Sequence, residues 1–391
     1  MNKYIAFILM TGCFFSCTHT HTGKDKIVSS IVEEGVISSS VPQKLTVRLT
    51  EDIYDRLETV LQPVSYVKLS NTPLLGRIKK VCIIDEHIFV WDVASGIVCY
   101  DMSGKFLFLL NARGQGPGEY TDISAFTINT HLKELVIYDN AKQTLMFYSA
   151  KNGKFLRSEQ FNKPAPTEMA YFGGYFLYNN RLHRNYQDDV SLHYSLLASK
   201  DGIHIDHRYF KHQEREEQYP FSVSMRNLHD NYSKLYYCRD FDNIIYQVDE
   251  DSVIPRFQVE LPQPVPNSKI EERPDEMKLL RSGYSLGITD IYQQGGLLSF
   301  RFIKDGAILS CLYDIKEKKQ ICCAKRIKFF DSSFVDTIDG VYKDCFYSIL
   351  TPEYIGYALS ENPEEFSDFF KEYDEQDDNP VIGFYKLSTN M

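Results

Sequence analysis

The sequence repeats itself with a period of nearly fifty residues, and this repeat constrains the fold more than any other feature. Asp92 corresponds to Asp139, 47 residues later, and Gly104-Lys105-Phe106-Leu107 corresponds to Gly153-Lys154-Phe155-Leu156, 49 residues later. Each unit contains four short segments rich in β-branched and aromatic residues. A period in the forties built from four strands is typical of a β-propeller. The sequence therefore predicts an all-β protein, a six-bladed β-propeller with one repeat per blade.

The repeat also predicts where most blades lie. The first blade is expected to contain strands at 78–84, 87–93, 97–102 and 105–110, and the second at 123–129, 134–138, 144–149 and 155–161. A third, more divergent blade is expected over 168–210. The fourth repeats the pattern of an aromatic strand followed by Asp at Asp240, 101 residues or two periods after Asp139. The fifth is expected over 288–329, and the sixth from residue 334 to the last strand at 381–387.

Two features of the sequence bear on how the ring closes and what interrupts it. Val64-Ser65-Tyr66-Val67-Lys68-Leu69 reads as a strand without a repeat of its own, and its pairing with the C-terminal blade would remove the open edge. An amphipathic helix is expected before it, from an N-cap at Thr50 to Pro63.

Two short helical inserts are predicted as well. One covers 274–281, and the other begins at Asn362, with Pro363 and Glu365 in a capping box.

The first segment of the chain has the features of a targeting signal. Lys3 supplies a positive charge, Tyr4 to Phe15 form an apolar run, and small residues precede two cysteines. We expect a lipoprotein signal over 1–17 with Cys17 as the lipidated residue, and Cys13 is the alternative. An ordinary cleaved secretory peptide is the other interpretation. A flexible tether is expected over 18–45 and the propeller over 46–391, which places the protein in the cell envelope, on the periplasmic or cell-surface side.

Charge and cysteine usage exclude several classes of partner. The formal net charge is −10 with acidic and basic residues well mixed, so nucleic acid is not an expected partner. We expect contact with a membrane only through the lipid anchor, and a monomeric ring. Seven cysteines follow Cys17, an odd number without a C-x-x-C pair, which argues against a disulfide framework and a zinc site. A pairing of Cys311 with Cys323 across the hairpin at Lys316-Glu317-Lys318 is a minor alternative.

The loop Arg113-Gly114-Gln115-Gly116-Pro117-Gly118-Glu119-Tyr120 is the first candidate binding site. Its glycines allow successive N–H groups to point one way, a geometry that holds an anion. Arg113 would add a guanidinium and Glu119 an acceptor, with Gln115 and Tyr120 beside them. The alternative is structural, since glycine loops in β proteins usually solve a backbone problem first. The loop would then only turn the chain, with Glu119 holding backbone and Tyr120 packed between blades.

Acidic turns are expected on the same face as this loop. Strands alternate in direction within a blade, so the turn between the second and third strands lies on the face of the connection to the next blade. Asp92, Asp139 and Asp240 occupy such turns. Aspartates cap turns more often than they bind metal, so no cofactor or metal is predicted, and calcium is the one ion these turns could hold. No known catalytic motif occurs in a usable context.

The block GQGPGEY at 114–120, followed by ELVIYDN at 134–140 and NGKFL at 152–156, resembles the six-bladed β-propeller lipoproteins of Bacteroides and related gut bacteria. The resemblance covers residues 53–161 most strongly. It implies a lipid-anchored envelope protein from a group whose activities are mostly unassigned. It supplies no catalytic residues.

Two functions from different classes remain open on this sequence. The first is a binding module that holds a glycan, a peptide or a partner protein on the face of the glycine loop. The second is an enzyme of the metal-dependent lactonase, lyase or glycosidase type with its site at the channel mouth. Acidic residues converging on the ring axis with Asn or His would favour the enzyme. The sequence shows no such cluster, so binding is the expected function.

Overall fold

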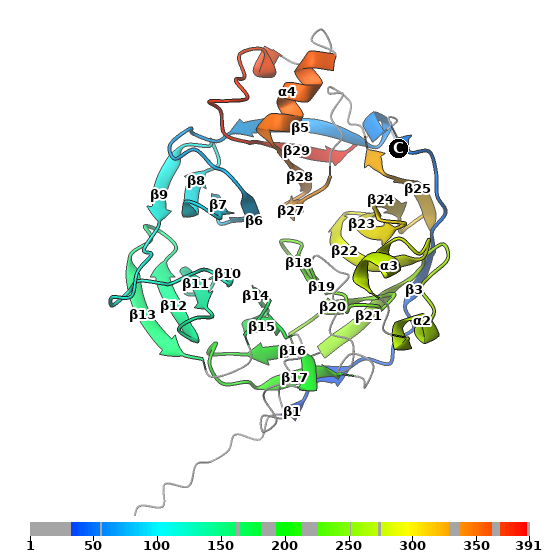
Figure 1. Ribbon diagram of the computed structural model, residues 1–391, viewed down its shortest axis with the longest axis horizontal. Coiled ribbons are helices and arrows are strands. Elements are labelled where there is room, and N and C mark those ends of the chain that lie inside the picture. The colour runs from blue at the N-terminus through cyan, green and yellow to red at the C-terminus, as the bar shows by residue number, and fades with distance from the viewer. Residues whose placement is uncertain are drawn as a thin grey trace, which may run out of the picture. The chain divides into compact units, whose positions relative to one another are not determined.

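Six sheets surround a common axis in the computed structural model (Figure 1). The structure describes residues 33–54, 57–161, 165–180, 193–212, 226–250, 252–272, 275–327, 337–361 and 368–388, all within the compact unit Val32–Met391. Consecutive strands within each blade are antiparallel. The predicted six-bladed β-propeller is confirmed. Cys13 and Cys17 lie outside the described residues.

The first three blades follow the repeat closely. The first contains β6 (Ile78–Ile84), β7 (His87–Asp92), β8 (Gly96–Asp101) and β9 (Phe106–Leu110). The second contains β10 (Ala125–Asn129), β11 (Glu134–Asp139), β12 (Thr144–Ser149) and β13 (Phe155–Gln160). The third contains β14 (Glu168–Phe172), β15 (Tyr175–Asn179), β16 (Tyr194–Ser199) and β17 (His207–Lys211).

The last three blades complete the ring. The fourth contains β18 (Leu228–Asp230), β19 (Leu235–Tyr237), β20 (Ile244–Val248) and β21 (Ser252–Glu260). The fifth contains β22 (Ser285–Gln294), β23 (Leu297–Lys304), β24 (Ala307–Asp314) and β25 (Lys319–Ala324). The sixth contains β27 (Gly340–Tyr342), β28 (Cys345–Leu350), β29 (Val381–Leu387) and β5 (Leu61–Lys68).

The sixth blade closes the ring as predicted. β5, from the N-terminal part of the chain, is its outermost strand and pairs antiparallel with β29 from Leu61↔Leu387 to Lys68↔Val381. Pro63 is tolerated because β5 is an edge strand, where a missing N–H breaks no ladder. The closure therefore joins the two ends of the propeller through main-chain hydrogen bonds.

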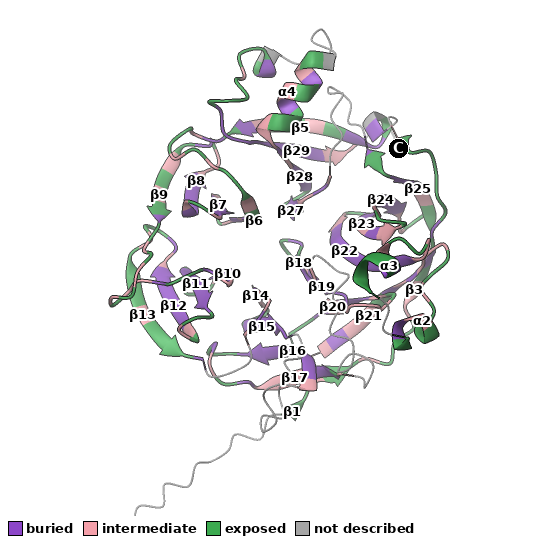
Figure 2. Cartoon of the chain, in the orientation of Figure 1, coloured by how far each residue is buried: buried purple, intermediate pink, exposed green. Residues whose placement is uncertain are grey.

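Burial explains why the middle strands of the blades are almost entirely apolar. Every residue of β11 is buried, and so are four of the six residues of β12. Neighbouring blades pack face to face, so both faces of a middle strand lie in a core, and the strand shows no polar alternation. Outer strands differ. β13 is mostly exposed, which Figure 2 shows in green.

The segment before β5 runs along the outside of the ring, and we call residues 33–54 the N-terminal belt. Its strands are β1 (Glu33–Glu34), β2 (Val36–Ile37), β3 (Gln43–Thr46) and β4 (Ile53–Tyr54). β1 pairs in parallel with β17, both β2 and β3 with β21, and β4 with β26 (Arg326–Ile327). Residues 33–45, expected as part of a flexible tether, thus carry strands. Blade edges offer unpaired N–H and C=O groups, and the belt satisfies them.

The helix expected after Thr50 is wrong. In its place lie β4 and a short 3-10 helix, η1 (Leu57–Thr59). Three of the four apolar positions that suggested a helical face are buried all the same, since Leu57, Val60 and Leu61 pack against Leu312 and Phe346, whereas Ile53 is 47% exposed. Tertiary packing and edge pairing thus override the local helical pattern.

The first predicted helical insert, over 274–281 after the fourth blade, contains a helix as expected. There α3 (Glu276–Leu280) begins at an N-cap, Asp275, whose side chain accepts from the N–H groups of Met277 and Lys278. A further short helix, α2 (Asn267–Glu271), was not expected. In the sixth blade the helix α4 (Pro352–Glu361), which precedes the predicted second insert, was not expected.

The predicted start of the second insert, Asn362 with Pro363 and Glu365, lies outside the described residues. A 3-10 helix, η3 (Asp368–Phe370), follows. Phe370 and Ile355 of α4 pack in one cluster with Leu350 and Val381, so the insert is attached to the closing blade. Within the described residues, no helix is both long and apolar enough to cross a bilayer.

Candidate ligand site along the ring axis

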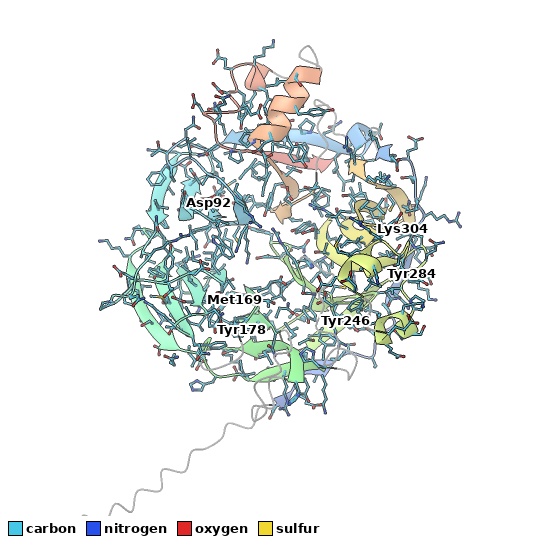
Figure 3. The ribbon with its side chains drawn as sticks, in the orientation of Figure 1. Asp92, Met169, Tyr178, Tyr246, Tyr284 and Lys304 are labelled. Carbon is cyan, nitrogen blue, oxygen red and sulfur yellow. The ribbon has the colours of Figure 1, made fainter. Side chains whose placement is uncertain are left out.

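A cavity of about 610 Å³, which we call the axial cavity, lies among the innermost strands. All six blades contribute to its wall, from Lys79 to Asp85 in the first blade to Asp339 and Tyr347 in the sixth. Met169, labelled in Figure 3, lines it from the third blade. Every innermost strand begins on the face of the blade-connecting loops, so one end of the cavity lies on the face of the loop 113–120.

Two cations on the wall hold main-chain carbonyls of other blades. Lys80 Nζ of β6 lies 2.9 Å from the carbonyl oxygen of Phe126 and 3.1 Å from that of Met169, in the second and third blades. Arg226, which precedes β18, donates from Nη2 to the carbonyl oxygen of Lys79 at 3.1 Å. The innermost strands have no further strand toward the axis, so these side chains satisfy carbonyls that no ladder can reach.

Arg226 also contacts the aromatic part of the wall. Its Nη1 donates to the Tyr292 hydroxyl at 3.4 Å. Burial acts to lower the pKa of Arg226, but the charges of Tyr292, Asp290 and Asp339 outweigh it and raise the pKa. Arg226 is therefore a permanent cation in the wall of the cavity.

His229 stands out among the buried polar residues of the cavity. It is 1% exposed, lies on β18 and lines the cavity. Burial lowers its pKa to about 4, with Arg226 adding to the effect, so the imidazole is neutral at physiological pH. Its ring meets Tyr292 edge to face, with centroids 6.2 Å apart. Among the described residues, neither ring nitrogen has a hydrogen-bond partner.

Carboxylates at the cavity differ in how they are held. Arg301 lies 3.4 Å from Asp339 and 3.5 Å from Asp290. Glu168 accepts from the N–H groups of Asn227 and Leu228. Burial raises the pKa of Asp339 and of Asp230, although residue 230 as a whole is exposed. Asp230 accepts a hydrogen bond from the Tyr232 N–H, at 3.0 Å.

The polar groups of the glycine loop form hydrogen bonds mostly within the loop and with neighbouring segments. The Glu119 carboxylate accepts from the Gly116 N–H at 2.8 Å. Arg113 donates to the carbonyl of Val93, and Tyr120, fully buried, donates to that of Leu110. Arg113 and Gln115 have exposed side chains, while Glu119 is half-buried. The structure thus brings the loop together as a turn between blades, which is the structural alternative stated above.

The acidic turns likewise cap backbone. Asp92 is fully buried and accepts from the N–H groups of Gly76, Ala94 and Ser95. Asp139 is equally buried and accepts from those of Thr121, Ala141 and Lys142.

Asp240 is half-buried, and in the same turn Asp242 accepts from the N–H groups of Asn243 and Ile244. Within the described ranges, no group of three or more His, Cys, Asp or Glu is placed to hold a metal ion. Cys311 and Cys323 face each other in β24 and β25 as free thiols.

A family model described as "Domain of unknown function (DUF4934)" matches residues 46–386. The chain belongs to this DUF4934 family. Among solved structures, the DUF4934 chain is similar to a crystal structure of a "Putative exported protein" from Bacteroides fragilis, with 16% identity and a TM-score of 0.70, over 87% of this chain and 100% of the other. At this identity the likeness shows the fold alone.

The DUF4934 chain is also similar to a member of the DUF4221 family from Bacteroides vulgatus, with 8% identity and a TM-score of 0.47, over 85% of this chain and 99% of the other. None of the curated proteins matches the sequence. The resemblance is therefore confirmed for the six-bladed propeller fold, and the family that the chain belongs to is DUF4934.

The sequence analysis missed the cavity residues Lys80, Arg226 and His229. Only their position in the repeat could have identified them from the sequence. Lys79 and Lys80 lie at the start of a strand that continues as Val-Cys-Ile-Ile, and His229 lies at the start of the fourth repeat. A charged or ionisable residue at the start of a repeat's first strand points to the ring axis, because that strand is always innermost. Applied to each repeat, this rule would have found Lys80 and His229, whereas Arg226 precedes its strand.

Proposed function

We propose that this DUF4934 protein is a ligand-binding module of the cell envelope that holds its ligand in the axial cavity. The observation that carries the proposal is a cavity of about 610 Å³ whose wall contains the buried imidazole of His229, which accepts and donates no hydrogen bond among the described residues. A buried polar group without a partner costs stability, and such groups in native proteins are commonly completed by a ligand or water. The volume is typical of small-molecule sites.

The glycine-loop face serves in this proposal as the mouth of the site. Arg113 and Gln115 are exposed on the loop, so they are available to an arriving ligand or to a partner protein. Glu119, Tyr120, Asp92 and Asp139 act through the backbone contacts described above and shape the mouth. Asp240, half-buried in its turn, belongs to the same rim. Lipidation at Cys17 would keep this module at the membrane surface.

The experiment is a small-molecule binding screen on the chain lacking residues 1–17, read by ligand-observed NMR. Hits are then measured against Ser124→Trp, which places an indole at the mouth of the cavity, where Ser124 is half-buried. Ser103→Trp is the matched control, because Ser103 is exposed on a turn of the opposite face. Binding lost in Ser124→Trp alone supports the proposal. Hits that bind both variants equally place the ligand elsewhere, and turnover of a hit would make the protein an enzyme.

A further inference from the structure

The outer edges of the six blades differ in what covers them. The N-terminal belt lies against the third, fourth and fifth blades, where β1 pairs with β17, β2 and β3 pair with β21, and the Thr50 N–H donates to the carbonyl of Cys323 in β25. Within the described residues, β9 of the first blade and β13 of the second pair with no strand on their outer sides. Figure 1 shows β9 on the circumference of the ring. An uncovered edge presents N–H and C=O groups that can pair with another chain.

Two outer strands that the belt leaves uncovered carry residues that oppose such pairing. β5, the outer strand of the sixth blade, contains Pro63 and Lys68. β13 contains Arg157 and Glu159. A proline lacks the N–H that a ladder needs, and charged side chains lose hydration when a further strand covers them. Both strands are therefore protected against pairing with another chain.

β9 is the outer strand without this protection. Its sequence is Phe-Leu-Phe-Leu-Leu over 106–110, with neither a charge nor a proline. Leu107 and Leu109 are each 39% exposed, and Phe106 and Phe108 are half-buried. An open and wholly apolar edge strand is a site where another chain pairs, because pairing removes both the apolar side chains and the free main-chain groups from water.

The apolar surface of β9 continues onto the second blade. Gly153, in the turn before β13, approaches the ring of Phe108 so closely that a Cβ there would lie 2.8 Å from it. Phe155 and Leu156 follow in the chain and are 41% and 49% exposed. The edge of the first blade and the start of β13 thus form one apolar patch on the outside of the ring.

A second copy of the chain supplies a strand that matches this edge. If two copies of β9 pair antiparallel about a two-fold axis at Phe108, Leu107 of each copy lies opposite Leu109 of the other. In the same register, Phe106 lies opposite Leu110. Every cross-strand pair is then apolar, and aromatic and aliphatic pairs of this kind stabilise a sheet.

The residues that flank β9 allow this register. Lys105 falls opposite Asn111 of the second copy, so no like charges oppose each other. A charged segment of another protein would instead lose hydration against Leu107 and Leu109. A two-fold axis uses the same patch on both copies, which a self-complementary apolar strand satisfies.

We propose that the protein forms a two-fold symmetric dimer in which two β9 strands pair antiparallel and join the four-stranded first blades into one sheet. One strand pair with its flanking side chains buries less surface than a permanent dimer does, so the dimer is reversible, with a dissociation constant in the micromolar range. The monomeric ring expected from the sequence is then the dissociated state. The inference concerns the outside of the ring and does not depend on the axial cavity.

The test is sedimentation-velocity ultracentrifugation of the chain lacking residues 1–17 over a series of concentrations. We expect the sedimentation coefficient to rise with concentration from that of a monomer to that of a dimer. Leu107→Lys places a charge in the strand pair and should weaken association at least tenfold. Leu132→Lys is the matched control and should associate as the parent does, because Leu132 is 57% exposed in the turn between β10 and β11, two inner strands of the second blade.

Thermal melts check that each variant is folded, and Leu109→Lys replaces Leu107→Lys if the latter fails to fold. Disulfide trapping then tests the register, because residues directly opposite each other in an antiparallel pair are close enough for a disulfide. After mild oxidation, the double variant Leu107→Cys, Leu109→Cys should run as a covalent dimer on a gel without reductant, whereas Leu132→Cys should not. None of the seven cysteines that the structure describes is exposed, so they leave this result clear.

Three outcomes would overturn the inference: the parent chain sediments as a monomer up to high micromolar concentration, Leu107→Lys and Leu132→Lys associate alike, or the double cysteine variant dimerises without a disulfide between copies. A chain lacking residues 1–32 tests the other occupant, the segment 18–32 upstream of the belt, since the compact unit begins at Val32. If that chain dimerises and the chain lacking residues 1–17 does not, residues 18–32 cover β9 and the inference is wrong.

Discussion

Arg226 Nη2 and the carbonyl oxygen of Lys79 lie 3.1 Å apart, although the two residues belong to the fourth and first blades, which face each other across the ring. Lys80 makes the same kind of contact to the second and third blades. The propeller is therefore held together at its axis by cations that bind main-chain oxygens, as well as by the apolar packing between blades.

Loss of the Arg226 contacts should destabilise the ring. Hydrogen bonds from charged groups contribute about 1.5–3 kcal/mol each, so Arg226→Met, which removes the bonds to Lys79 and Tyr292, should lower the free energy of unfolding by about 3–6 kcal/mol. Arg226→Lys keeps the charge and should recover part of the loss. Urea unfolding followed by circular dichroism measures both. An unchanged midpoint for Arg226→Met would show that the contact across the axis contributes nothing.

The closure between β5 and β29 can be tested within one strand. Leu61 is 1% exposed and packs against the fifth and sixth blades, whereas Val64 is 51% exposed. Leu61→Ala should therefore cost about 2–5 kcal/mol. Val64→Ala, the matched control on the same strand, should change stability by no more than about 0.5 kcal/mol. Equal losses in thermal melts of the two variants would contradict the closure as described.

The glycine loop predicts a coupling between two residues. A Cβ at Gly114 would lie 2.0 Å from Glu119 Oε2, so Gly114→Ala should displace the carboxylate from the Gly116 N–H and cost about 1 kcal/mol. In a Glu119→Ala background the same change should cost almost nothing, because the colliding atoms are gone. A double-mutant cycle of unfolding free energies measures the coupling. Additive losses would mean that Glu119 does not occupy the loop.

Asp378 should make stability depend on pH. Burial raises its pKa, but hydrogen bonds from Lys68, the Asp374 N–H and Asn71 outweigh burial and hold the pKa below the ordinary value. Because the folded pKa is the lower one, the stabilisation is complete above the unfolded pKa of about 3.9 and is lost as pH falls through the folded pKa.

The melting temperatures of the parent chain and Asp378→Asn should therefore differ at pH 6 and converge below about pH 4. Asp377→Asn, at an exposed neighbouring position, is the control and should follow the parent chain throughout. A constant difference between the parent chain and Asp378→Asn down to pH 2 would contradict the assignment.

The leader predicts a difference between two cysteines. Cys17→Ser should release the protein from membranes, because the lipid would have no attachment site, while Cys13→Ser should leave it bound. Fractionation of cells into membrane and soluble parts, followed by immunoblotting, measures this. The reverse pattern would assign the anchor to Cys13, and a parent chain found in the soluble part would favour an ordinary secretory signal.

The repeat made most of the fold predictable because each unit carries the same local pattern. The strands of the first two blades lie within two residues of their expected limits, since apolar runs bounded by Asp and Gly turns fix them. The repeat could not predict the N-terminal belt. Glu33–Glu34 and Val36–Ile37 become strands only because the outer edges of other blades are there to pair with them.

The helix α4 was not predicted, although the sequence offers a signal for it. Thr351-Pro352 places a capping residue before a proline, as Asn362-Pro363 does. The structure has a helix from Pro352, which buries Ile355 and Ala358 against the closing blade. A pattern of capping residues does not say which segment reaches an apolar surface, so the formation of α4 depends on tertiary packing.

The candidate site was less predictable than the fold. The sequence marks the glycine loop and the acidic turns as candidate sites because their composition is unusual for a β protein. In the structure, these residues serve the backbone geometry of the turns. Lys80 and His229 lie in strands of ordinary composition, and only their place in the ring brings them to the axial cavity.

The N-terminal belt has a mechanical consequence. A pull on the chain upstream of Glu33 loads the belt strands one after another. The two residue pairs of β1 with β17 come first, then the two of β2 with β21, the four of β3 with β21 and the two of β4 with β26. The closure of the ring, with seven residue pairs between β5 and β29, carries the load only after these have separated. If the upstream end is anchored as proposed, the belt would therefore bear a pull on the chain before the ring does.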